Sequence, residues 1–273
     1  MLESELEAAS QLVRDAGRIL LEIYATDFGV DFKSASDPVT EADRRADAFL
    51  VAGLRARFPG DAIVAEESAA HGAGAAGSRC WFVDPLDGTK EFIAKNGEFS
   101  IMLGLAIDGR AVLGAVYQPV ADKLYRGVVG QGAELLQAGR RSPLRVSECT
   151  EPSALGLVVS RSHRPAHTDA LVERLAITRE RPSGSVGIKV GLIAEREADL
   201  YVHLSGRSSK WDACAPDAIL RAAGGRFTDL LGADIDYRAP GVLNARGLLA
   251  CNDAAWGAVL PVVRDVARQA GFQ

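Results

Sequence analysis

The sequence predicts an α+β protein in which layers of helix and sheet pack as one unit. Three observations support this class: an N-terminal region with apolar residues at helical spacing, a middle region of short apolar runs joined by turn residues, and a second half in which strand-like and helix-like segments alternate. The chain of 273 residues contains no internal repeat and no low-complexity linker. We therefore expect a single unit over residues 1–273, with an α+β half at about 1–150 and an α/β half at about 151–273.

The N-terminal region contains two predicted amphipathic helices. In the first, apolar residues recur at intervals of three and four, at Leu6, Ala9, Val13, Ala16, Leu20 and Ile23. The second follows Thr40, a candidate N-cap, with Asp43 three residues later in the position of a capping box. We expect this second helix to run from about Glu41 to Arg57.

Short apolar runs after the Pro59-Gly60 turn predict a mainly antiparallel sheet. Four strands are expected, at residues 62–65, 80–83, 100–107 and 111–117. The last two are separated by Asp108-Gly109, a dipeptide typical of a two-residue hairpin turn.

The second half is predicted to alternate between strands and helices. Strands are expected near 155–160, 199–203 and 248–251, and helices near 168–176, 188–196 and 212–223. Gly224-Gly225 ends the last of these helices, and Asn252 is a plausible N-cap for a C-terminal helix.

Composition excludes several classes of function. The chain has 31 Lys and Arg against 36 Asp and Glu, a net charge of -5, and no stretch with a strong excess of cations. A polymeric nucleic acid or an anionic membrane surface is therefore disfavoured as a partner, whereas a small anionic ligand is not. No apolar run approaches the about 18 residues of a membrane-spanning helix.

The four cysteines and the one glycine-rich motif carry no chemistry of their own. No C-x-x-C pair occurs among Cys80, Cys149, Cys214 and Cys251, so a zinc ribbon or dithiol redox site is absent, and reduced thiols in a cytoplasmic protein are expected. The segment 72–77 matches G-x-G-x-x-G but precedes a predicted strand instead of following one. We expect it to be a loop.

The segment Asp84-Pro85-Leu86-Asp87-Gly88-Thr89 is the most informative in the chain. A buried strand delivers Asp84 at its end, and Asp87 returns to the same point. Two such carboxylates repel each other unless protons or cations neutralise them, and a hard divalent ion does so at neutral pH. Solvated aspartates in an Asx-turn explain the same residues, so this motif alone leaves both interpretations open.

Three further acidic positions accompany this segment. Glu66 and Glu67 directly follow a predicted strand, Asp212 lies at the start of a helix, and Asp43 lies in the first turn of another. Taken singly, each has a structural explanation, as a solvated loop, an N-cap and a capping-box residue respectively.

Taken together, these motifs resemble a known family. Glu66-Glu67, Asp84 to Thr89 and Trp211-Asp212-Ala213-Cys214-Ala215-Pro216 are similar, in order and separation, to the signatures of the inositol monophosphatase superfamily of magnesium-dependent, lithium-sensitive phosphatases. The resemblance covers nearly the whole chain. It implies the layered α-β-α-β-α sandwich of the sugar phosphatase type, which inositol monophosphatase and fructose-1,6-bisphosphatase share.

The resemblance also implies roles for individual residues. Two or three Mg²⁺ ions would be held by Glu66, Asp84, Asp87, Asp212 and the backbone carbonyl of Leu86. The catalytic residues would be Asp43, Thr89 and Glu66, with Asp43 and Thr89 taking the proton of a metal-bound water. No G-x-S-x-G elbow or active-site cysteine signature supports a covalent intermediate.

Within the superfamily, the details favour one branch. Asp87-Gly88-Thr89-Lys90-Glu91-Phe92 resembles the 3'(2'),5'-bisphosphate nucleotidases, because inositol monophosphatases usually carry Asn where this chain has Glu91. Ser160-Arg161-Ser162-His163 is likewise similar to the nucleotidase form. Substrate would be bound by Asp87, Gly88, Thr89, His163, Lys189 and Asp212, with Arg161 as a further candidate.

The implied reaction is hydrolysis of adenosine 3',5'-bisphosphate to AMP and phosphate, a step of sulfur metabolism. Two alternatives remain open: an inositol or other sugar monophosphatase, and a regulatory binding protein that keeps the fold without the activity. Homodimers are common in parts of the superfamily, and the sequence by itself shows no interface.

Overall fold

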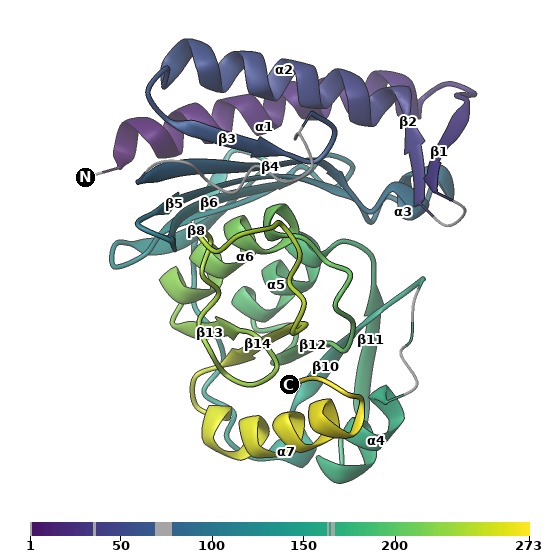
Figure 1. The fold of residues 1–273 in the computed structure, drawn as a ribbon, viewed down its shortest axis with the longest axis vertical. Coiled ribbons are helices and arrows are strands. Elements are labelled where there is room, and N and C mark those ends of the chain that lie inside the picture. The colour runs from purple at the N-terminus through teal and green to yellow at the C-terminus, as the bar shows by residue number, and fades with distance from the viewer. Residues whose placement is uncertain (1, 35–36, 69–77, 163, 165–166) are drawn as a thin grey trace.

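Five alternating layers of helix and sheet make up the protein. The computed structural model describes residues 2–34, 37–68, 78–162, 164 and 167–273. From top to bottom in Figure 1, the layers are a pair of helices, a seven-stranded sheet, a second pair of helices, a five-stranded sheet and a third pair of helices. The expected α-β-α-β-α sandwich is confirmed.

The three pairs of helices alternate with the two sheets in space. The upper pair is α1 (Glu3–Tyr24) and α2 (Glu41–Arg57), the middle pair is α5 (Val186–Ala194) and α6 (Lys210–Ala222), and the lower pair is α4 (Thr168–Arg174) and α7 (Trp256–Gln269). A short helix α3 (Thr89–Ile93) follows the strand that carries Asp84, and a 3₁₀ turn spans Pro152–Ala154.

The seven-stranded sheet has the strands in chain order and is antiparallel except for its first pair. Its strands are β3 (Ala62–Ala65), β4 (Arg79–Asp87), β5 (Ser100–Ile107), β6 (Arg110–Gln118), β7 (Lys123–Val128), β8 (Gly132–Gln137) and β9 (Arg140–Leu144).

The five-stranded sheet is mixed, in the order β11-β10-β12-β14-β13. Its strands are β10 (Gly156–Ser160), β11 (Arg179–Ser183), β12 (Leu200–His203), β13 (Gly225–Thr228) and β14 (Leu248–Asn252). A separate antiparallel hairpin of β1 (Val30–Ser34) and β2 (Asp37–Thr40) leads into α2.

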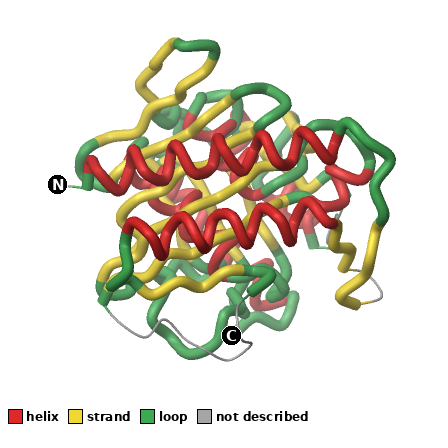
Figure 2. The backbone as a smooth tube through the Cα atoms, turned by 90° about the horizontal axis from the view of Figure 1, so that it is seen from above, coloured by secondary structure: helices red, strands yellow, loops and turns green. Residues whose placement is uncertain are grey.

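The two N-terminal helices form as the sequence predicts. The apolar stripe of α1 is buried, and Figure 2 shows α1 and α2 side by side across one face of the seven-stranded sheet. Helix α2 begins at Glu41 and ends at Arg57, and Thr40 and Asp43 close the expected capping box. This cap places Asp43 at the same end of the molecule as the end of β4.

Close contact between the upper sheet and the middle helices depends on two glycines. A Cβ atom added to Gly104 of β5 or to Gly114 of β6 would lie 2.5 Å and 2.2 Å from backbone atoms of Ala215 in α6. No side chain fits there, so α6 packs directly on the backbone of the sheet. The same packing brings Asp212, one turn earlier in α6, to the end of β4.

Two features of the fold differ from the prediction. Helix α7 begins at Trp256 and not directly after Asn252, because Asn252 caps a preceding turn by accepting a hydrogen bond from the Ala255 amide at 2.8 Å. Strands β7, β8, β9, β11 and β13 and the β1–β2 hairpin were not predicted. The segment Arg179–Ser183 shows why, since four of its five residues are exposed and polar or proline, as befits an edge strand.

Three smaller expectations concern the rest of the chain. All four cysteines are free thiols. Within the described ranges, no helix is both long and apolar enough to cross a membrane. The glycine-rich segment 72–77 lies outside the described residues.

Candidate active site

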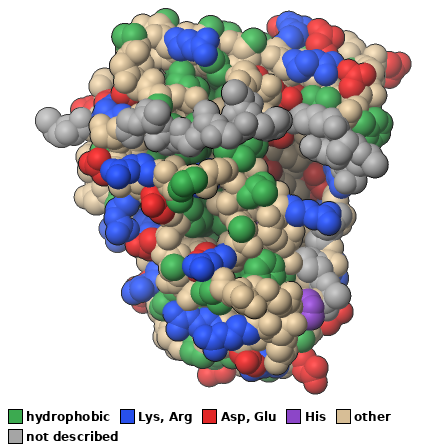
Figure 3. Space-filling model, in the orientation of Figure 1, with side chains coloured by type: hydrophobic (Ala, Val, Ile, Leu, Met, Phe, Trp, Pro, Cys, Tyr) green, Lys and Arg blue, Asp and Glu red, His purple; other side chains and the backbone are tan. Residues whose placement is uncertain are grey.

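A pocket opens where the upper sheet, α3 and the five-stranded sheet meet. It has a volume of about 310 Å³, and its lining comes from both halves of the chain, including Asp87, Thr89, Lys90, Glu91, Ser162, Ser185, Lys189, Tyr201 and His203. Figure 3 shows the surface hollowed on the right, between the upper and lower halves of the molecule. The larger groove at the β7–β9 end contains none of the predicted site residues.

Asp43 and Thr89 lie side by side, as the sequence predicts for a proton-transfer pair. Asp43 is buried, and its Oδ2 accepts hydrogen bonds from the Thr40 amide and hydroxyl, both at 2.7 Å. Its Oδ1 accepts from Thr89 Oγ1 at 3.1 Å. Burial raises the pKa of Asp43, although the Thr40 and Thr89 donors act in the opposite direction. One carboxylate oxygen is thus fixed by the capping box and the other faces Thr89.

Asp84, like Asp43, is a carboxyl group of the site that is almost completely buried. It is 1% exposed, at the end of β4, and accepts a hydrogen bond from the Leu86 amide at 3.0 Å. Its pKa is raised well above the ordinary value, first by burial and then by the negative charges of Glu66, Asp87 and Asp212. Four carboxyl groups from three segments, the end of β3, β4 and the start of α6, therefore act on one point.

Asp87 connects β4 to the N-terminus of α5. Its Oδ2 accepts hydrogen bonds from Ser185 Oγ at 2.5 Å and from the Gly187 amide at 3.1 Å. These bonds hold the Asp87 side chain against the N-terminus of α5. Only Oδ2 is engaged in these bonds, which leaves Oδ1 as the oxygen available to a ligand.

Asp212 and Glu66 complete the carboxylate group. Asp212 closes a capping box at the start of α6, where its Oδ2 accepts from the Ser209 amide at 2.7 Å. Burial raises its pKa, and the charge of Asp87 raises it further. Glu66 lies directly after β3, with its amide bonded to the Val83 carbonyl at 3.1 Å on the neighbouring strand. Asp43 has the capping-box role that the sequence allowed, but Asp212 is not the N-cap of α6, because Ser209 is the N-cap and Asp212 is the third residue of the helix. Glu66 is half-buried and not a solvated loop residue.

The turn between β4 and α3 requires glycine. Gly88 has φ 101°, a left-handed conformation that favours glycine, and a Cβ added there would lie 3.1 Å from the Glu98 carbonyl oxygen. This turn starts α3 with Thr89 as its first residue. Thr89 and the Leu86 carbonyl oxygen are consequently within 3.3 Å of each other.

Lys189 is buried beside the carboxylates. It is 4% exposed, its Nζ donates to the Ser185 carbonyl at 2.9 Å, and it lies 5.2 Å from the centre of the Tyr201 ring. Burial lowers its pKa, while the charges of Asp87, Glu91, Glu98 and Asp212 oppose this change. Of the other predicted substrate contacts, Arg161 is bound to Glu98, and His163 lies outside the described residues.

The carboxylates do not form a ready-made metal site. Among the described residues, no three His, Cys, Asp or Glu side chains are grouped as metal ligands. The carboxylate oxygens are the hard ligands that Mg²⁺ prefers, so the chemistry of the donor set fits the ion.

Sequence reasoning missed several residues in and around the pocket. Ser100 and Ser185 share a hydrogen bond at 2.8 Å below Asp87, Tyr201 packs on Lys189, and Glu98 binds the segment after β10. None of them belongs to a recognisable motif. Ser185 has a positive φ of 54°, which is visible only in the folded chain.

The comparisons with known proteins define the class to which this fold and site belong. The profile of the inositol monophosphatase family matches residues 1–266. The chain therefore belongs to the inositol monophosphatase family.

Individual members of this family resemble the chain over most of its length. The chain is 37% identical over 237 residues to the 3'(2'),5'-bisphosphate nucleotidase CysQ of Salmonella typhimurium, covering 85% of this chain and 93% of that protein. Among solved structures, it resembles CysQ from Bacteroides thetaiotaomicron, with a TM-score of 0.74 and 29% identity over 91% of this chain and 97% of that one. The IMPase of Thermotoga maritima has a TM-score of 0.82 and 28% identity, over 98% and 100% of the two chains.

Proposed function

We propose that this protein is a Mg²⁺-dependent phosphomonoesterase that removes the 3'-phosphate of adenosine 3',5'-bisphosphate, giving AMP and phosphate. The observation that carries the proposal is the convergence of Glu66, Asp84, Asp87 and Asp212 beside a pocket that Lys90 and Lys189 also line. The CysQ relatives support the nucleotide as substrate. The class of reaction is phosphate-ester hydrolysis, and recycling of a by-product of sulfur metabolism is its role.

The four carboxylates and the Leu86 carbonyl would hold two or three Mg²⁺ ions. The charges of Glu66, Asp87 and Asp212 all raise the pKa of Asp84, so cations at this point relieve a repulsion that otherwise costs stability. When bound, such ions lower the pKa of a coordinated water and stabilise charge on the phosphoryl oxygens. Lithium inhibition follows from the family resemblance.

Asp43 and Thr89 would accept the proton of the attacking water. Thr89 Oγ1 donates to Asp43 Oδ1, so the hydroxyl oxygen of Thr89 is oriented to accept a proton while its own proton passes to Asp43. The Thr40 bonds to Asp43 Oδ2 hold the carboxylate still during this transfer. Water is the nucleophile, and no covalent intermediate forms on the protein.

The second phosphate of the substrate requires cations of its own. Lys90 is exposed at the rim of the pocket, and Lys189 is buried in its wall. The backbone amides of Gly88 and Thr89, at the turn that starts α3, would meet the phosphate that is removed. The four free thiols fit a reducing compartment, and we place the enzyme in the cytoplasm.

Parallel measurement of phosphate release tests the proposal. Adenosine 3',5'-bisphosphate and inositol 1-phosphate are supplied at equal concentration with Mg²⁺. A preference for the nucleotide of tenfold or more is expected. A preference for inositol 1-phosphate would keep the metal chemistry but show that the protein is a sugar monophosphatase, and release from neither substrate would favour a regulatory binding protein.

A further inference from the structure

The rim of the pocket contains a polar connection between the two halves of the chain that the reaction itself does not use. Glu98, just before β5, accepts two hydrogen bonds from the Arg161 guanidinium, from Nε and from an Nη atom, both at 2.6 Å. The same carboxylate accepts from the Gly184 amide at 2.8 Å. Glu98 thus binds the residue after β10 and the residue after β11, two segments of the lower sheet.

Glu91 makes a parallel connection a short distance away. It is 5% exposed and accepts a hydrogen bond from the Ser162 hydroxyl. A Cβ atom added to Gly184 would lie 2.5 Å from Glu91 Cγ and 2.3 Å from the Glu98 carbonyl oxygen. Residue 184 is therefore enclosed by the two glutamates and has no room for a side chain.

These contacts act on the turn that holds Lys189. Ser185, next to Gly184, has φ 54°, a conformation that costs free energy and persists only when its surroundings hold it. The Ser185 carbonyl accepts the hydrogen bond of Lys189 Nζ. The position of the ammonium group consequently depends on the position of this turn.

Two carboxylates of the upper half hold the turn, one on each side. Asp87 binds Ser185 Oγ and the Gly187 amide, and Glu98 binds the Gly184 amide. Asp87 is also one of the carboxylates of the reaction site, whereas the Glu98 carboxylate accepts its hydrogen bonds from Arg161 and Gly184. Bidentate Arg–carboxylate pairs are among the stronger and more directional polar contacts in proteins.

We infer that Glu98, through Arg161 and Gly184, is a positioning residue that sets Lys189 for the second phosphate of the substrate, and so determines selection of a bisphosphate over a monophosphate. This inference rests on the proposed function. Arg161 is in this account a structural partner of Glu98 and not a ligand of the nucleotide. Glu98 itself does not touch substrate. It affects selectivity by holding the Gly184–Ser185 turn, on which the position of Lys189 depends.

The test compares two nucleotides that differ only in the second phosphate. Steady-state kinetics are measured with adenosine 3',5'-bisphosphate and with adenosine 3'-monophosphate, for the wild-type enzyme and for Glu98→Gln, Arg161→Met and the double variant. Glu98→Gln keeps an oxygen that can accept from Gly184 but removes the charge that binds Arg161. Arg181→Met is the matched control, since Arg181 on β11 forms an exposed ion pair with Glu197 away from the pocket.

For Glu98→Gln, KM for the bisphosphate should rise about tenfold while kcat changes by less than about twofold, because a charge-assisted contact is lost but the reacting groups stay in place. KM for the monophosphate should stay within about twofold. The double variant should match the single variants, since both remove one connection. Arg161→Lys should recover part of the loss, and Arg181→Met should behave as wild type.

Three results would overturn the inference: an equal rise of KM for both nucleotides, additive effects in the double variant, or an unchanged preference in Glu98→Gln. Thermal unfolding of each variant separates a general loss of structure from a change in selectivity. If the wild-type enzyme itself does not prefer the bisphosphate, the proposed function fails. The wild-type kinetics alone therefore distinguish failure of the proposed function from failure of the inference, which only the variants show.

Discussion

At the scale of single residues, the site is built from side chains that serve structure and chemistry together. Asp43 and Asp212 each close a capping box at the start of a helix, and each is thereby aimed at the end of β4. A cap normally stabilises a helix by about 1 kcal/mol. Here the cap also fixes a carboxylate whose charge is unfavourable in its surroundings. The capping hydrogen bonds therefore hold the carboxylates of the site in place despite their mutual repulsion.

Asp84→Asn is expected to separate activity from stability. The change removes a ligand charge with little change of shape, so kcat/KM with Mg²⁺ should fall by about a hundredfold or more. Because Asp84 is buried among three other acids, the free energy of unfolding without added metal should stay equal or increase. Phosphate release and urea unfolding measure the two quantities.

Asp212→Asn also tests whether the carboxylates of the site are metal ligands. It should lose activity to a similar extent, while its amide side chain can still accept from Ser209 and keep α6 capped. Normal turnover in both variants would contradict the assignment of these carboxylates as metal ligands.

Lys90→Met tests the exposed cation of the pocket. Lys90 lies at the rim, so its loss should raise KM for adenosine 3',5'-bisphosphate several-fold, by about 1 kcal/mol or less of binding energy, with kcat retained. The control is Lys95→Met, because Lys95 Nζ donates to the carbonyls of Tyr24 and Thr26. Equal kinetic effects of the two changes would mean that Lys90 acts only through the overall charge of the surface.

At the scale of elements, the distance between layers decides whether the site assembles. Helix α6 carries Asp212, and it reaches the end of β4 only because Gly104 and Gly114 leave the face of the upper sheet bare where the helix passes. The position of α6 is therefore set by two strands that contribute no side chain to the site.

Gly114→Ala is expected to destabilise the fold. The added Cβ would lie 2.2 Å from the Ala215 carbonyl oxygen, and such overpacking costs about 1–3 kcal/mol. Activity should fall as well, because α6 carries Asp212 away from Asp84. Gly60→Ala is the control, since no atom lies within 4 Å of the added carbon, and its unfolding midpoint in urea should stay close to that of the wild type.

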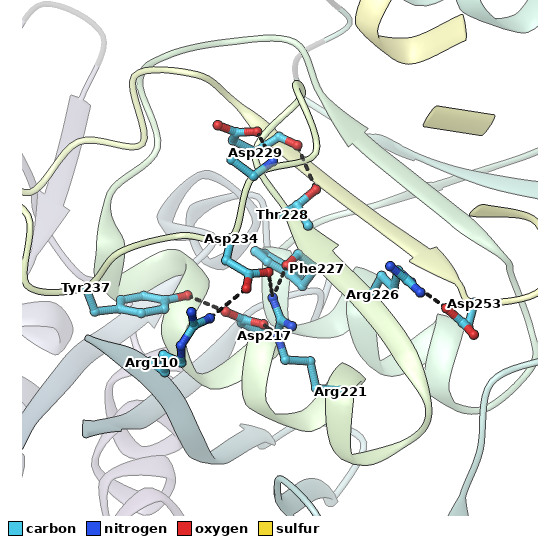
Figure 4. A network of polar contacts seen from close by, with 11 residues as sticks. Arg110, Asp217, Arg221, Arg226, Phe227, Thr228, Asp229, Asp234, Tyr237 and Asp253 are labelled. Atoms are coloured by element: carbon cyan, nitrogen blue, oxygen red, sulfur yellow. Dashed lines mark hydrogen bonds and ion pairs between the residues drawn. The ribbon is translucent and has the colours of Figure 1, made fainter. Parts of the chain in front are cut away.

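At the scale of the whole molecule, a second polar network joins the two halves on the side away from the pocket. Figure 4 shows Asp217 of α6 bound to Arg221 and to the Tyr237 hydroxyl, the latter at 3.0 Å. Arg221 also binds Asp234, which in turn accepts from Arg110 of the upper sheet at 2.6 Å. The interior acid of this network is Asp217, which is 2% exposed.

Asp217 is expected to make stability depend on pH. Burial raises its pKa to about 6, against the effect of its Arg221 and Tyr237 donors. An unfolded aspartate titrates near pH 4. Between about pH 4 and 6 the folded protein therefore holds a proton at this site that the unfolded chain releases, and stability falls as pH rises through this window, by up to about 3 kcal/mol.

Urea unfolding of the wild type and of Asp217→Asn at several pH values isolates this contribution. Subtracting the two profiles removes the contributions of the other titratable groups. The free energy of unfolding of the wild type relative to Asp217→Asn should decrease as pH rises to 6. A flat difference, or one of opposite sign, would mean that Arg221 keeps Asp217 ionised throughout.

The surface of the molecule accords with a small ligand. On the face drawn in Figure 3, cationic and anionic side chains are interspersed over the upper and lower halves. The sequence predicts the same from its charge distribution, because the 31 basic and 36 acidic residues are mixed along the chain.

The sequence by itself determined the elements whose pattern is local. Capping box, apolar stripe and hairpin turn depend on residues within a few positions of one another, and so α1, α2 and the β5–β6 hairpin were predictable, the hairpin from Asp108 and Gly109 with φ of 50° and 81°. The acidic motifs could be recognised for the same reason, since each consists of residues close together in the sequence. Exposed edge strands such as β11 were not, since their side chains show no alternation.

Only the tertiary structure decided which of these residues meet. Asp87 and Ser185 are 98 positions apart, and Glu98 and Arg161 are 63 apart, so no local pattern records their contact. The sequence offered Arg161 as a candidate contact for nucleotide, and only the fold shows that it pairs with Glu98. The physical reason is that hydrogen bonds and charges act over a few ångströms of space, whereas sequence patterns report only neighbours along the chain.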